Sequence, residues 1–136
     1  MEPYKKYREN YIETKDILKQ IENEYFVYVY WTTCPHCLVL VSTILRYLDN
    51  KNAKCKLYLL DFTGEKDDLL FNDTVMKAKE SMMDFIKRYE KSSIGARNVK
   101  DISYYFVPML LHIKDGTIIR SVVLEDRIME YLKEYE

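Results

Sequence analysis

The chain has 136 residues, of which 48% are hydrophobic and 32% are charged, and its formal net charge is -1 at pH 7. This composition is typical of a globular protein and argues against a disordered chain. The length suits one compact domain, so we expect residues 1–136 to form a single domain.

Lysine and arginine alternate with acidic residues along the chain. This pattern argues against a nucleic-acid partner, which needs a concentrated basic surface. No apolar run approaches the roughly 20 residues that span a bilayer, so we expect no membrane span. The first 20 residues lack the apolar core of a secretory signal, which predicts a cytoplasmic protein. A leader removed ahead of residue 1 would instead place the protein outside the cytoplasm.

The first predicted element is an amphipathic helix from about Tyr4 to Asn23. Its apolar residues recur at steps of three, four or seven: Tyr4, Tyr7, Tyr11, Leu18 and Ile21. Residues 25–31, YFVYVYW, are aromatic or β-branched throughout. Such a run predicts a strand that is buried on both faces of a sheet.

A second helix is predicted from Pro35 to Asp49, because proline is favoured in a first helical turn and Thr33 or Cys34 can cap it. The next strand is expected at Lys56 to Phe62. The strand, helix and strand between residues 25 and 62 should form a parallel unit.

A long middle helix is expected from Lys66 to Lys91, followed by a loop around residues 92–99. Residues 106–113 and 117–124 are two apolar runs that flank Lys114-Asp115-Gly116, and Asp-Gly between such runs predicts an antiparallel hairpin. An amphipathic helix from about Leu124 ends the chain. The pattern predicts an α/β fold with a central mixed four-stranded sheet flanked by helices.

The Cys34-Pro35-His36-Cys37 motif lies where the first strand becomes a helix. Backbone N–H groups and the helix dipole favour the thiolate form of a cysteine at this position. We therefore expect Cys34 to be the exposed nucleophile and Cys37, one turn inward, to be the shielded resolving thiol. Pro35 starts the helix between them.

His36 lies inside the motif, where it could stabilise the Cys34 thiolate as a donor or cation. The alternative is an exposed histidine without a partner. Trp31, the only tryptophan, lies beside the motif either as packing or as part of the surface that contacts substrate.

A pair of thiols can also be half of a zinc or copper site. His36 is awkwardly placed between the two cysteines for this purpose, and Cys55 and His112 are predicted in buried strands. We therefore expect no metal and no other cofactor. Cys55 is interpreted as a small apolar residue.

The strand that enters the Cys34-Pro35-His36-Cys37 motif, the Val107-Pro108 step and the Lys114-Asp115-Gly116 hairpin together resemble the thioredoxin superfamily. The resemblance covers most of residues 25–136, and the Cys-Pro-His-Cys tetrad and Val-Pro dipeptide look like those of the DsbA branch. It implies a thioredoxin fold in which Pro108 is cis and faces the cysteines, and the Val107 backbone pairs with a substrate strand.

Tyr28 occupies the position where thioredoxins carry a buried acid, so the usual proton acceptor for Cys37 is absent. The middle helix is longer than in thioredoxin and smaller than the DsbA insertion. The resemblance implies a thiol-disulfide oxidoreductase whose partners are protein or small-molecule thiols and disulfides, together with a reductase or oxidase. The segment YVYWTTCPHC also resembles bacteriocin-transport accessory proteins, which gives the alternative of a binding protein with little or no redox turnover.

Overall fold

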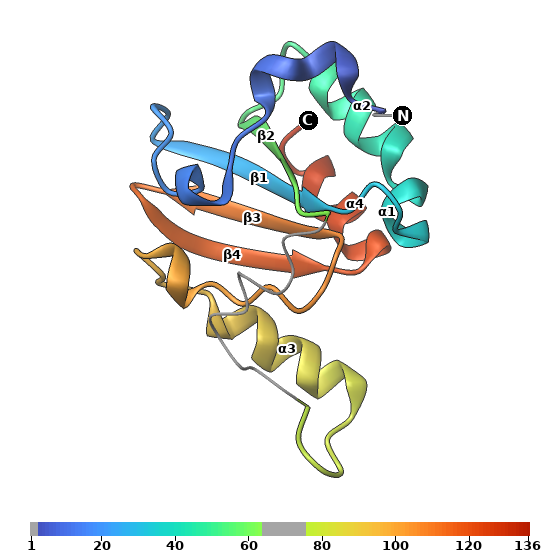
Figure 1. Cartoon of the computed structure of the whole chain (residues 1–136), viewed down its shortest axis with the longest axis vertical. Coiled ribbons are helices and arrows are strands. Elements are labelled where there is room, and N and C mark those ends of the chain that lie inside the picture. The colour runs from blue at the N-terminus through green and yellow to red at the C-terminus, as the bar shows by residue number, and fades with distance from the viewer. Residues whose placement is uncertain (1–2, 64–75) are drawn as a thin grey trace.

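A central sheet organises the computed structural model, which describes residues 3–63 and 76–136. Its strands are β1 (Glu24–Tyr30), β2 (Lys56–Asp61), β3 (Met109–Lys114) and β4 (Thr117–Val123). They lie in the order β2-β1-β3-β4 (Figure 1). β1 is parallel to β2 and antiparallel to β3, and β3 is antiparallel to β4. The predicted α/β class with a mixed four-stranded sheet is confirmed.

Helices cover both faces of this sheet. They are α1 (Pro35–Val39), α2 (Val41–Asp49), α3 (Met82–Ser92) and α4 (Glu125–Lys133). α1, α2 and α4 pack on one face and α3 packs on the other (Figure 1). Side chains of β1 alternate between the two faces, and every residue from Tyr25 to Tyr30 is at most 2% exposed. The first strand is therefore buried on both faces, as predicted.

The predicted helix from Tyr4 to Asn23 is wrong. The segment contains two short 3-10 helices, η1 (Lys5–Asn10) and η2 (Thr14–Asp16). Between them the backbone N–H of Ile12 donates to the Leu59 carbonyl of β2 at 2.9 Å, so the chain follows the outer edge of the sheet. Hydrogen bonds to a strand replace the bonds of a regular helix here.

Two other helices differ from the sequence prediction. The helix after Pro35 is divided at Leu40, whose φ of -85° and ψ of -5° interrupt the regular turns. The middle helix begins only at Met82, because Ser81 caps it by accepting from the Asp84 N–H at 3.1 Å. Residues 76–81 are not helical, which corrects the prediction there. Residues 66–75 of the predicted helix lie outside the described residues.

The hairpin between β3 and β4 is confirmed, with φ of +52° at Asp115 and +74° at Gly116. Both values belong to a turn that glycine, aspartate and asparagine favour. β3 starts later than predicted, at Met109, so that residues 106–108 form a loop ahead of it. The last helix lies close to its predicted position.

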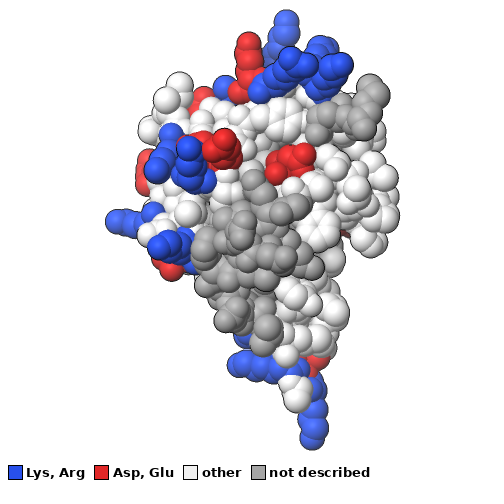
Figure 2. Space-filling model, in the orientation of Figure 1, with Lys and Arg blue, Asp and Glu red and all other residues white. Residues whose placement is uncertain are grey.

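Charged side chains on the face shown in Figure 2 lie mostly around the rim, where basic and acidic groups are near one another. This view agrees with the interleaved charges of the sequence. Within residues 3–63 and 76–136, no helix combines the length and apolar character that crossing a bilayer requires.

Candidate active site

The dithiol motif lies at the end of β1, where the chain turns into α1. Cys34 is the N-cap of this helix, and its Sγ accepts a hydrogen bond from the Cys37 N–H at 3.2 Å. Pro35 occupies the first turn, where its missing N–H costs no helical hydrogen bond. The helix start therefore directs a backbone donor at the first sulfur, as the spacing predicted.

Both cysteines are free thiols with little access to solvent. Cys34 is 8% exposed and Cys37 is 3% exposed. The expectation that Cys34 is an exposed residue is wrong, because the loop ahead of β3 covers it. The Val107 carbonyl oxygen of that loop lies 3.9 Å from the Cys34 Sγ. Cys34 is still the more accessible of the pair.

Burial, together with a hydrogen bond to Cys34, raises the pKa of the Cys37 thiol to about 12. A hydrogen bond with the Trp31 backbone acts in the opposite direction, and the charge of Glu125 adds a small increase. Cys37 is therefore a protonated thiol at neutral pH in the reduced protein.

Tyr28 lies beneath the motif, fully buried, and interacts with both thiols and with Tyr4. Burial raises the pKa of its phenol far above the ordinary value. At neutral pH the phenol therefore keeps its proton and does not act as a base for Cys37. The structure thus places a neutral hydroxyl at the position where the resemblance to thioredoxins implies a buried acid.

The loop before β3 forms the other wall of the site. The Val107-Pro108 peptide bond is cis, as expected. Val107 packs against the same apolar cluster that holds both cysteines. Trp31 is half-buried and packs against the apolar clusters on both faces of the sheet, at the edge of the site.

A pocket of about 440 Å³ opens beside the motif. It is lined by His36, Phe106, Val107, Pro108, Leu124, Glu125, Asp126 and Arg127. Leu38 and Val39 on α1 are more than half exposed. The pocket lies against the Val107-Pro108 loop, whose Val107 carbonyl faces the Cys34 Sγ.

His36 is exposed, but it is not without a partner. Its Nδ1 contacts the Glu125 carboxylate at the start of α4, while 72% of its side chain remains exposed. Glu125 therefore belongs to the site although sequence reasoning missed it. No local motif marks it, because it lies 89 positions away and reaches the site only through folding.

Comparison with known proteins gave no match to any family model and no significantly similar curated protein. The fold and the site by themselves define a mixed α/β protein with a shielded dithiol at a strand-to-helix junction.

Proposed function

We propose that the chain is a thioredoxin-like thiol-disulfide oxidoreductase that exchanges disulfides with protein substrates through Cys34 and Cys37. One observation carries this proposal: the Cys34 sulfur caps α1 and receives the Cys37 N–H, so that a thiolate there gains a backbone donor and the helix dipole. The strand order and the parallel pairing of β1 with β2 support the thioredoxin-like assignment.

The first chemical step is the attack of the Cys34 thiolate on one sulfur of a substrate disulfide. The substrate S–S bond breaks as the bond between the Cys34 sulfur and the substrate forms. The other substrate sulfur leaves with the electron pair as a thiolate and takes a proton from water. The pocket next to Val107 and Pro108 is the surface that would hold the substrate chain during this attack.

The second step releases the substrate. The Cys37 sulfur attacks the Cys34 sulfur, which forms the intramolecular disulfide and expels the second substrate sulfur with its electron pair. The Cys37 proton passes to water and the departing substrate thiolate takes up a proton in turn. The substrate has then gained two electrons and the protein has lost two. A separate dithiol reductant restores the pair, and the same steps in reverse would oxidise a substrate with the help of an oxidase.

The test is reduction of insulin by dithiothreitol in the presence of the protein. We expect the wild-type protein to accelerate the reduction and Cys34→Ser to abolish the acceleration. Cys37→Ser should retain the first step and accumulate a mixed disulfide that is visible by mass spectrometry. Ser42→Ala, an exposed change on α2, is the control and should behave as wild type. Equal rates for wild type and Cys34→Ser would refute the proposal.

The alternative is a thioredoxin-like accessory protein with little or no redox turnover. It is favoured by the burial of both thiols and by the neutral Tyr28 phenol beneath them. The oxidoreductase needs Cys34 as a thiolate, whereas the accessory protein does not. An alkylation rate of Cys34 that stays low at neutral pH, together with no catalysis of insulin reduction, would select the accessory protein.

A further inference from the structure

A second cluster of potential ligands lies at the opposite end of the sheet from the dithiol motif. Glu24 begins β1, Cys55 directly precedes β2 and His112 lies near the end of β3. Because β1 is parallel to β2 and antiparallel to β3, these positions meet at one end of the sheet. The Glu24 carboxylate, the Cys55 thiol and a His112 nitrogen lie within 4.8 Å of one another.

We propose that Glu24, Cys55 and His112 bind a zinc ion, with a fourth position open to water. Thiolate, imidazole and carboxylate are the three ligand types that zinc takes in proteins, whereas calcium and magnesium require oxygen ligands. In a tetrahedral site with bonds of about 2.0 to 2.3 Å, the ligand atoms lie about 3.3 to 3.8 Å apart. Small side-chain movements suffice to reach this spacing.

His112 is held in the orientation that a ligand requires. It is 1% exposed, its Nε2 lies 2.6 Å from the Glu24 carboxylate, and its Nδ1 lies 2.7 Å from the Tyr131 hydroxyl. With zinc on Nε2, the Nδ1 proton donates to the Tyr131 oxygen. A partner on the second ring nitrogen is the usual arrangement around a histidine ligand.

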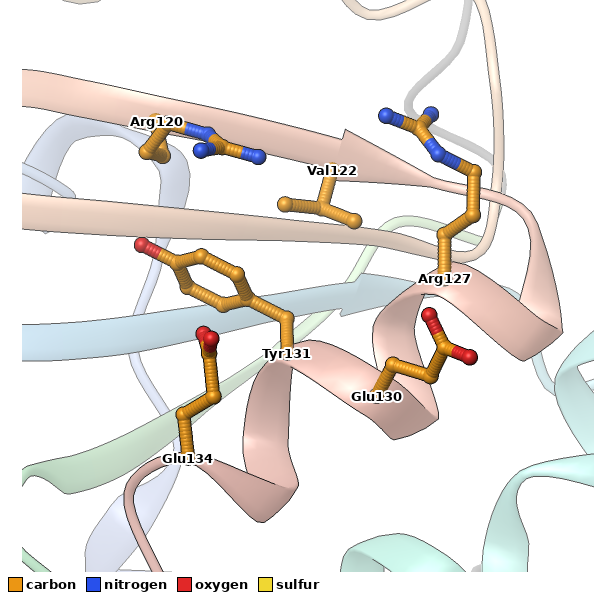
Figure 3. Close-up of a pocket in the computed structure, with 6 residues that line it drawn as sticks. All are labelled: Arg120, Val122, Arg127, Glu130, Tyr131 and Glu134. Carbon is orange, nitrogen blue, oxygen red and sulfur yellow. The ribbon is translucent and has the colours of Figure 1, made fainter.

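Tyr131 is itself held in place between α4 and β4. Its ring lies on α4 with Arg120 of β4 over it, at 5.0 Å from the ring centroid. Figure 3 shows Tyr131 extending from α4 toward β4, in a pocket of about 230 Å³ whose wall includes Arg120. The partner of His112 is thus positioned by a contact that does not involve the ligands.

Charge balance and access also suit a zinc ion. Cys55 loses its thiol proton to solvent on binding, so that one thiolate and one carboxylate neutralise the two positive charges of the metal. This neutrality matters because Cys55 and His112 are almost fully buried. The Glu24 side chain is 35% exposed, which leaves an entry path for the ion and for the water ligand.

The test uses Co²⁺ as a spectroscopic substitute for zinc in a Cys34→Ser/Cys37→Ser protein, in which Cys55 is the remaining thiol. We expect one equivalent of Co²⁺ to bind and to produce a sulfur-to-cobalt charge-transfer band. Adding Cys55→Ser should abolish the band. Tyr131→Phe should keep the band and weaken the affinity by about 10- to 100-fold, because it removes the partner of a ligand rather than a ligand.

Two results would overturn the zinc site. One is the absence of saturable Co²⁺ or Zn²⁺ binding to the Cys34→Ser/Cys37→Ser protein at micromolar metal, which would leave the three residues as a hydrogen-bonded cluster only. The other is a band that persists after Cys55→Ser. Circular dichroism of each variant establishes that it is folded. Glu24→Gln preserves the size of the side chain and changes a second ligand, so it should also weaken metal binding at least about tenfold.

Discussion

The two thiols of the motif are one helical turn apart but have different surroundings. Cys34 sits at the start of α1 and accepts a backbone N–H, whereas Cys37 lies inside the turn against Tyr28. Burial, not the neighbouring sulfur, is the main cause of the raised Cys37 pKa. The resolving thiol should therefore remain protonated even when its partner is removed.

This difference predicts the reactivity of Cys37 in a Cys34→Ala/Cys55→Ser protein, where it is the only cysteine. We expect iodoacetamide to modify Cys37 slowly at neutral pH. The reaction should still be slow at pH 9.0, where an ordinary cysteine is half ionised. The rate should rise only above pH 9.0, because burial, the largest cause of the raised Cys37 pKa, remains when Cys34 is replaced. The reaction is followed by mass spectrometry, with urea-unfolded protein as the reference. A folded-protein rate equal to the unfolded rate at pH 9.0 would contradict the burial of this thiol.

At the scale of elements, Glu90 connects α3 to β4 and α4. This carboxylate is 7% exposed, accepts from the Val123 N–H at 2.9 Å and receives both Nη groups of Arg127. Removing it leaves a backbone donor and a partly buried guanidinium without their acceptor.

We therefore expect Glu90→Ala to lower the free energy of unfolding by about 2 to 4 kcal/mol. Glu13→Ala is the matched control, because Glu13 pairs with Lys15 where both side chains are 73% exposed. An exposed pair of this kind contributes at most about 1 kcal/mol. Urea unfolding followed by circular dichroism measures both. Equal losses for the two variants would show that Glu90 does not hold α3 in place.

The elements also show which parts of the structure follow from local sequence. The buried strand at residues 25–31, the Asp115-Gly116 turn and the helix start at Pro35 carry their own signals, and each was predicted close to its observed position. The segment from Tyr4 was misassigned because its tyrosines at helical spacing instead fill space along the edge of β2. The contacts of Glu125 with His36, and of Glu24 with Cys55 and His112, join distant positions, and no local pattern predicts them.

The whole molecule buries an unusual number of ionisable hydroxyl and thiol groups. Thirteen tyrosines are present, and burial raises the pKa of most of those packed in the core. It also raises the pKa of Cys37 to about 12. The folded chain therefore keeps protons that the unfolded chain releases at its ordinary pKa values of 9.0 for cysteine and 10.0 for tyrosine.

Since the folded state binds more protons above about pH 9, the free energy of unfolding should fall as the pH rises from there toward 12. Below pH 9 these groups are protonated in both states and contribute no slope. Once the unfolded group has ionised, each proton that only the folded state retains lowers the free energy of unfolding by about 1.4 kcal/mol per pH unit. Tyr28→Phe should remove one such contribution above pH 10. Urea unfolding at a series of pH values between 7 and 11 measures how the free energy of unfolding changes with pH. Identical slopes for wild type and Tyr28→Phe would contradict a Tyr28 phenol that stays protonated beneath the dithiol.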